Sequence, residues 1–252
     1  GSLLEYTMEF ENVNLFPITT GVNESNHLTL GGFDAVELTS TFGTPLYVFD
    51  ENTIRYMCRQ FVGEFTKRYP NTRVVYASKA FTNPIIAKLV KEEGLGLDVV
   101  SGGELAIAKV VDFPSESIYF HGNNKSADEL EMALDYGVGC IVVDNFHELE
   151  MLQGLSLKKN VVQKVMLRLS PDVDPHTHAH TTTGVLDSKF GFAMETGHAE
   201  QAALQVLQAP NLKLVGLHFH LGSPIFELEP YTIAIDAALQ FAAKFKHQGL
   251  EL

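Results

Sequence analysis

The feature that most constrains the fold is an alternation, beginning near Thr44, of short apolar runs with segments of helical periodicity. Such an alternation is typical of βαβ units on a parallel sheet. We therefore predict an α/β fold. The predicted strands are Pro45–Phe49, Arg73–Lys79, Leu97–Val100, Ser117–Gly122, Cys140–Asn145, Val165–Ser170 and Leu214–Gly222.

A polar or charged side chain stands at or near the end of most of these strands. Lys79, Asp98, His121, Asp144 and Arg168 follow one another at spacings of 19, 23, 23 and 24 residues, and His220 comes 52 residues later. One such side chain per βα unit fits a TIM-type barrel, in which the carboxyl ends of the strands build the site. An open doubly wound sheet is the alternative, but its Gly-rich loop after the first strand is missing. We expect about six of the eight barrel units.

The barrel domain is predicted to span residues 44–252 and to be incomplete at its C-terminal end. Residues 1–43 contain few helical cues and are predicted to form an irregular lead-in that packs on another domain. Residues 171–192 form a long polar segment, as functional loops often do.

Composition and charge exclude several classes of partner. The formal net charge is -13, and a polyanion needs clustered cations, so nucleic acid is not an expected ligand. No apolar window is long enough to cross a membrane, and the N-terminus lacks the layout of a signal peptide. The two cysteines, Cys58 and Cys140, lie in apolar segments and fit reduced, buried thiols. We therefore predict a cytoplasmic protein.

Lys79 and Asp98 are the first two candidate functional residues. A lysine at the mouth of a barrel is partly desolvated, and its amine could act as a Schiff-base nucleophile. The structural alternative is a lysine that extends from a strand end into solvent. Asp98 has no local structural explanation. Ser101 and Glu104, which follow it, also fit a capping box at the start of a helix.

His121 and Arg168 are candidates at later strand ends. His121 begins the turn HGNNK, whose glycine and asparagines turn chemistry alone could explain. Arg168 needs an anionic partner, which a bound phosphate or carboxylate would supply.

Two groups of histidines remain. His176, His178 and His180 alternate on one segment, but no cysteine or acidic cluster nearby completes a coordination set, so we predict no metal site. His218 and His220 should share one face of the last strand. His220 could stack on a flat cofactor ring while Ser223 holds a phosphate, or the two histidines could be satisfied core residues.

Together these motifs resemble the alanine-racemase-fold decarboxylases that use pyridoxal phosphate, most closely the diaminopimelate decarboxylases. They occur in family order over about residues 40–225. The matching segments are YASKAF (76–81), GLDVVSGGEL (96–105), FHGNNKS (120–126), VDNFHELE (143–150), LRLSPDVDPHTHAHTTTG (167–184), SKFGF (188–192) and GLHFHLGS (216–223).

The resemblance implies a role for each candidate residue. Lys79 would form the Schiff base with pyridoxal 5'-phosphate, and His220 would stack on its ring. Ser223 would contact the phosphate, and Glu104 would orient the stacked histidine. Asp98, His121 and Arg168 would complete the contacts to the cofactor.

The implied reaction is the decarboxylation of meso-2,6-diaminopimelate to L-lysine in lysine biosynthesis, by a homodimer with its active sites at the interface. A decarboxylase of ornithine, lysine or a carrier-bound aminoacyl group is one alternative, and a non-catalytic binding or regulatory subunit is another. Members of the family continue into a phosphate loop, an acidic partner for the ring nitrogen and a β domain. None of these follows Leu252, so we expect this chain alone to be inactive.

Overall fold

The computed structural model describes residues 13–171 and 190–250. The chain divides into two compact units, one of Gly1–Val74 with Glu92–Leu95 and the other of Val75–Lys91 with Gly96–Leu252. The predicted domain boundary at residue 43 stays a prediction.

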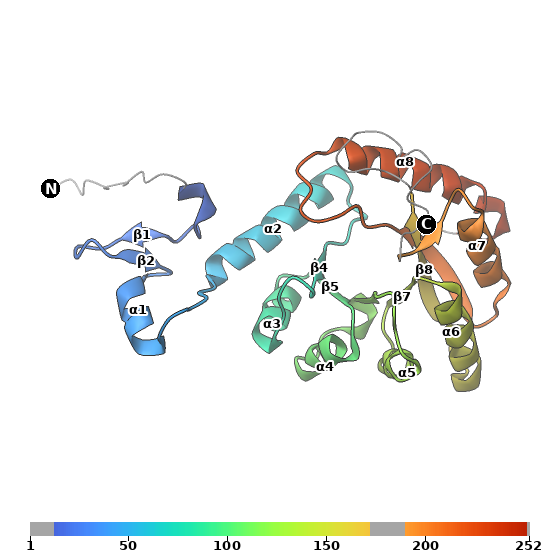
Figure 1. The fold of residues 1–252 in the computed structure, drawn as a ribbon, viewed down its shortest axis with the longest axis horizontal. Coiled ribbons are helices and arrows are strands. Elements are labelled where there is room, and N and C mark those ends of the chain that lie inside the picture. The colour runs from blue at the N-terminus through green and yellow to red at the C-terminus, as the bar shows by residue number, and fades with distance from the viewer. Residues whose placement is uncertain (1–12, 172–189, 251–252) are drawn as a thin grey trace. The chain divides into compact units, whose positions relative to one another are not determined.

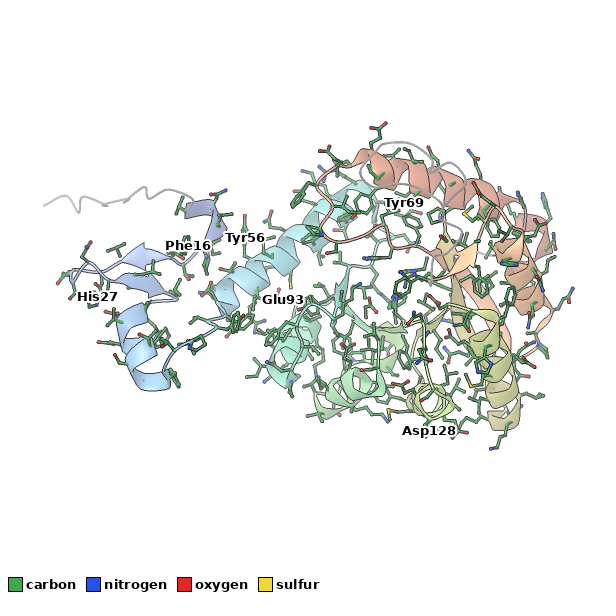
Figure 2. The ribbon with its side chains drawn as sticks, in the orientation of Figure 1. Phe16, His27, Tyr56, Tyr69, Glu93 and Asp128 are labelled. Atoms are coloured by element: carbon green, nitrogen blue, oxygen red, sulfur yellow. The ribbon has the colours of Figure 1, made fainter. Side chains whose placement is uncertain are left out.

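The first unit contains more regular structure than the sequence led us to expect for residues 1–43. A small antiparallel sheet precedes two helices (Figure 1). Asp34 begins the first helix by accepting hydrogen bonds from the backbone of Val36 and Glu37, and His27, labelled in Figure 2, contacts the same carboxylate at 2.8 Å. The elements are η1 Val13–Leu15, β1 Gly21–Val22, β2 Leu28–Leu30, β3 Phe33–Asp34, α1 Ala35–Phe42 and α2 Glu51–Arg68.

The first predicted barrel strand, Pro45–Phe49, is wrong. This segment has the composition of a strand but no ladder of hydrogen bonds to any strand among the described residues. A β-strand exists only with a paired neighbour, since lone extended backbone gains no ladder hydrogen bonds. Tyr47 accordingly stands 90% exposed.

The second unit is built on a parallel sheet. Its strand order, β10-β8-β7-β6-β5-β4, follows the order of the chain, and β9 pairs with β8. The strands are β4 Val75–Ala77, β5 Gly96–Val99, β6 Ile118–Phe120, β7 Cys140–Val143, β8 Gln163–Ser170, β9 Phe192–Ala193 and β10 Leu212–His218. A doubly wound sheet reverses its strand order at a switch point, and this sheet does not. The arrangement confirms the α/β class and is that of an incomplete TIM-type barrel.

Helices connect successive strands and cover the sheet (Figure 1). Ser126 and Glu129 form a capping box, and it starts α5. The helices are α3 Pro84–Glu92, α4 Gly102–Val110, α5 Ala127–Tyr136, α6 Phe146–Lys159, α7 His198–Gln208 and α8 Glu229–Ala243, with short 3-10 helices at η2 Ser115–Ser117 and η3 Lys246–Gln248. None of the helices in the described ranges is long and apolar enough to cross a membrane.

The core lies between the sheet and these helices. All four residues of β7 are buried, and Leu97, Phe120 and Leu167 from the neighbouring strands are at most 1% exposed. Strand β10 departs from regular pairing with β8, because the register shifts by one residue between Leu214 and Gly216.

Candidate active site

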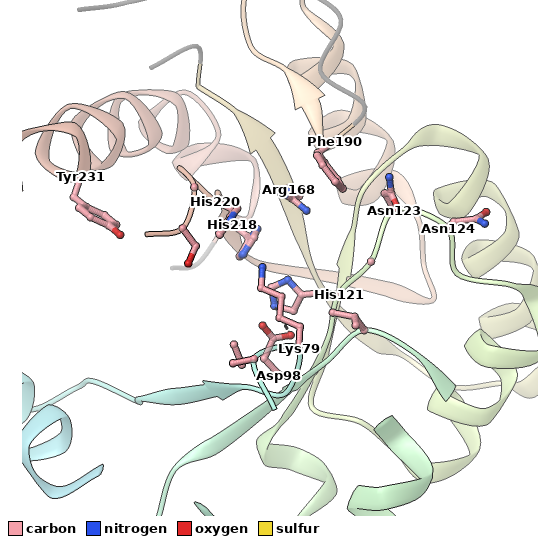
Figure 3. A pocket seen from close by; sticks show the side chains of 16 residues that line it. Lys79, Asp98, His121, Asn123, Asn124, Arg168, Phe190, His218, His220 and Tyr231 are labelled. Carbon is pink, nitrogen blue, oxygen red and sulfur yellow. Dashed lines mark ion pairs between the residues drawn. The ribbon is translucent and has the colours of Figure 1, made fainter. Parts of the chain in front are cut away.

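The carboxyl ends of the parallel strands surround a cavity of about 890 Å³ in the second unit (Figure 3). Six of the seven site residues predicted from the sequence line it, namely Lys79, Asp98, His121, Arg168, His220 and Ser223. They come from four strand ends and from the loop after β10. The barrel topology therefore brings together residues that are up to 144 positions apart in the chain.

Lys79 and Asp98 stand at the ends of the adjacent strands β4 and β5. The backbone N–H of Ser78 donates to the carbonyl oxygen of Asp98 at 3.0 Å, which continues the ladder up to the lysine. Burial raises the pKa of Asp98 to about 7, and Glu104 adds to the effect, while the positive charges of Lys79 and Arg168 oppose it. The carboxyl group therefore changes its protonation state near neutral pH.

His121, at the end of β6, faces the same carboxyl group. Its Nε2 lies 3.1 Å from Oδ1 of Asp98, but the geometry is not that of a hydrogen bond, and Oδ1 is buried without a hydrogen-bond partner among the described residues. The rings of His121 and His218 meet edge to face, with centroids 4.5 Å apart. Burial lowers the pKa of His121 to about 2 and that of His218 to about 3, so both imidazoles are neutral at pH 7.

Arg168 is held on two sides at the end of β8. Its guanidinium lies 4.4 Å from the ring centre of Phe190, and one of its nitrogens lies 3.8 Å from Oδ1 of Asp144. The same oxygen accepts the N–H of Gly191 at 3.1 Å. Gly191 has a φ of +75°, and a Cβ there would stand 2.7 Å from the carbonyl oxygen of Arg168, so only glycine fits. The arginine thus presents a fixed positive charge to the cavity.

His220 and Ser223 lie in the loop that follows β10 rather than in the strand. The predicted strand reached Gly222, but β10 ends at His218. His220 and Ser223 are exposed at the cavity, where a bound molecule could cover them. The predicted strand is therefore too long at its C-terminal end, and His218 within it and His220 beyond it both line the cavity.

Glu104 is the predicted site residue that does not line the cavity. Its carboxylate accepts the backbone N–H of Val100 at 2.7 Å, and its own N–H donates to Ser101 at the start of α4. His176, His178 and His180 lie outside the described residues. Within the described ranges there is no group of three His, Cys, Asp or Glu side chains that could hold a metal.

Sequence reasoning did not assign roles to Phe190 and Tyr231, which also line the cavity. Phe190 falls within the SKFGF motif, and that pattern was the only signal for it. Tyr231 belongs to α8, and nothing in the local sequence distinguishes it from a surface aromatic residue.

The cavity suits pyridoxal phosphate on structural grounds. It places an amine nucleophile, a titrating carboxyl group and a guanidinium around one space. Two of its buried polar atoms, Oδ1 of Asp98 and Nδ1 of His218, have no hydrogen-bond partner in the part of the chain that the structure describes. Buried polar atoms without partners are costly, and a polar ligand in the cavity would satisfy them. Lys79 would hold such a cofactor covalently, while Ser223 and Arg168 offer partners for its anionic groups.

Comparison with known proteins agrees with this geometry. Residues 54–252 match the family model described as the pyridoxal binding domain of pyridoxal-dependent decarboxylases. A diaminopimelate decarboxylase of Bacillus methanolicus is 48% identical over 216 residues, which are 86% of this chain and 50% of that protein. The enzyme of the same name from a Synechocystis strain is 41% identical over 251 residues, covering 96% of this chain and 53% of the relative.

A solved structure shares the fold as well. The crystal structure of a diaminopimelate decarboxylase from M. jannaschii in complex with L-lysine superposes with a TM-score of 0.84 at 33% identity, over 93% of this chain and 55% of that one. This chain therefore spans about half the length of the relatives that it matches.

Proposed function

Because the chain belongs to the pyridoxal-dependent decarboxylase family, we propose that its cavity binds pyridoxal phosphate through a covalent bond to Lys79. The placement of this lysine carries the proposal. Among the described residues that line the cavity it is the sole lysine, and it stands beside a carboxyl group and across from an arginine (Figure 3). An amine held at a strand end in a recessed site is suited to attack an aldehyde.

The remaining residues would bind and orient the cofactor. His220, in the loop after β10, would cover one face of a flat ring, and Ser223 would donate a hydrogen bond to a phosphate oxygen. Arg168 supplies positive charge on the side of the cavity that is lined by Phe190. Glu104 would act indirectly, because it holds the backbone of Val100, and Val100 lines the cavity.

Asp98, next to a neutral His121, would hold a proton beside the reacting atoms. Since the pKa of Asp98 is about 7 and His121 is neutral, a proton taken up near neutral pH resides on the carboxyl group. A group that titrates near the working pH can both give and accept a proton.

We further propose that the protein carrying this chain converts meso-2,6-diaminopimelate to L-lysine and carbon dioxide. Bound pyridoxal phosphate would accept the electron pair left by the departing carboxylate. The names of the relatives support this substrate, as does the L-lysine in the M. jannaschii complex. Arg168 offers a site for a substrate carboxylate or for an anionic group of the cofactor.

The proposal is tested by adding pyridoxal phosphate to the purified chain, reducing with borohydride and mapping the peptides by mass. A pyridoxyl group on Lys79 is the expected result. Reaction at other lysines to the same extent, or at none, would contradict the proposed site. Carbon dioxide release by the protein that carries this chain is then compared for diaminopimelate, ornithine and lysine. Preference for ornithine or lysine would reject the substrate and leave the cofactor site standing.

We also propose that the protein works as a homodimer in the cytoplasm. The family resemblance supports the dimer, and the two free, buried cysteines, Cys58 and Cys140, fit a reducing compartment. The mass in solution, measured by light scattering, is expected to be twice that of one chain. If the dimer dissociates with a Kd of about 1 μM, most chains are paired at about 100 μM. A mass of one chain at that concentration would therefore contradict the dimer.

A further inference from the structure

A buried ion pair lies behind the cavity and has no part in the function proposed so far. The side chain of Lys125 is 0% exposed and that of Glu148 is 3% exposed, and Nζ of the lysine lies 2.6 Å from Oε1 of the glutamate. The same ammonium donates to the carbonyl oxygens of Gly122 and Val142, each at 2.8 Å. All three donors of the ammonium group are therefore used inside the protein.

The pair is connected to the cavity at both ends. On one side, Gly122 belongs to the turn after β6 and lines the cavity. On the other side, Oε2 of Glu148 accepts the backbone N–H of Asp144 at 2.9 Å, and the carboxylate of Asp144 faces the guanidinium of Arg168. The path thus joins the ends of β6, β7 and β8, and it reaches the cavity at Gly122 and at Arg168.

Stability alone does not explain an ion pair at this place. Removing two charges from water is costly, and well-packed apolar residues of similar size often stabilise a protein as much or more. A buried pair of this kind can instead fix one arrangement of the groups around it. Here the groups held in place are the turn at Gly122 and the backbone of Asp144.

We propose that Lys125 and Glu148 are positioning residues that fix Asp144 and, through it, the direction of the Arg168 guanidinium. The inference concerns this chain's own side chains, and its effect on cofactor binding rests on the proposed function. It predicts that the pair matters only while Arg168 is present, whereas a merely structural pair would matter equally with or without the arginine.

The test is a double-mutant cycle on the full chain, read as the Kd for pyridoxal phosphate by visible absorbance. Lys125→Met/Glu148→Leu, which keeps the volume and removes both charges, is expected to weaken binding about tenfold. In an Arg168→Gln background, the same two substitutions should change the Kd less than about twofold. The proposal would be overturned if the two substitutions weakened cofactor binding equally with and without Arg168, or if they did not weaken it in the protein that keeps Arg168.

Lys159→Met/Asp135→Asn is the matched control. It removes an ion pair of 2.8 Å that joins α5 to α6 at the surface, and it should leave the Kd unchanged. If the apolar variant does not fold, Lys125→Met/Glu148→Gln takes its place, because the amide oxygen can still accept the Asp144 N–H while both charges are lost. This variant should weaken binding of pyridoxal phosphate when Arg168 is present and should not do so in the Arg168→Gln protein.

A second measurement separates this proposal from the proposed function. The Nε–Hε resonance of Arg168 in the cofactor-free chain, assigned by its loss in Arg168→Gln, should shift toward the value of an exposed arginine in the Lys125→Met/Glu148→Leu variant. If the wild-type chain binds no pyridoxal phosphate, the proposed function fails and this shift still decides the positioning role. An unchanged resonance would reject that role.

Discussion

Replacing Lys79 with alanine is expected to lower carbon dioxide release from diaminopimelate by at least about a thousandfold, and to abolish the pyridoxyl group recovered after borohydride reduction. The variant loses the amine that would bond to the cofactor and the group best placed to move protons beside it. The cavity keeps its other polar groups, so non-covalent binding of the cofactor should be weakened rather than abolished. Steady-state rates in the protein that carries this chain give the measurement.

Lys79→Arg separates covalent chemistry from charge. It keeps a cation next to Asp98 but cannot form the bond, and it should be as inactive as the alanine variant. Lys213→Ala serves as the control, because this lysine is exposed at the opposite, amino-terminal end of β10 and should not matter. Activity of Lys79→Ala within tenfold of wild type would show that another residue does this work.

Replacing Asp98 with asparagine should stabilise the cofactor-free chain at pH 8 by roughly 4 kcal/mol relative to wild type, and by much less at pH 4. The fold raises the pKa of this carboxyl from 3.8 to about 7, so the folded state binds a proton that the unfolded state has released. The stability associated with Asp98 is thus fully present below pH 3.8 and is lost as the pH rises toward 7. Asparagine does not ionise and avoids that loss. Urea unfolding at several pH values measures the difference.

Comparison of wild type with Asp98→Asn separates the pH dependence of stability that is due to Asp98 from that due to His121. His121 has a lowered pKa, so its contribution changes in the opposite direction and falls as the pH drops below about 6.5. It is present in both proteins and largely cancels. Asp236→Asn, at an exposed position on α8, should give no such pH-dependent gain. A stability gain of the same size at pH 4 and pH 8 would mean that Asp98 is not held protonated by the fold.

Six of the seven predicted strands correspond to observed strands because each is an apolar run that the helices bury on one side. The exception, Pro45–Phe49, shows the limit of the method. Its residues have strand propensity, but a strand also needs a hydrogen-bonded neighbour, and propensity in one segment does not contain that information. The short strands and α1 within residues 1–43 were missed for the converse reason, since they are too brief to produce a periodic pattern.

The site was predictable to the extent that one residue per strand end contributes to it. Lys79, Asp98, His121 and Arg168 could be placed together because parallel strands end on one side of a barrel. The contacts between residues were not predictable in this way. The link from Lys125 to Glu148 joins the turn after β6 to α6 through two long side chains, and sequence spacing does not reveal which of several lysines is buried. Tyr231 likewise enters the cavity only because of where α8 lies.

The register shift in β10 reverses which face of the sheet the side chains beyond it point to. In a regular strand, Leu214 and His218 would point to the same face, because they are four residues apart. Here Leu214 pairs with Val165 and is buried in the core, whereas His218 pairs with Arg168 and lines the cavity. One extra residue, Val215, reverses the alternation between them. The register of the strand, and not the identity of residue 218, therefore decides that this histidine faces the cavity. The same sequence on a strand without the shift would point the imidazole into the apolar layer under the helices.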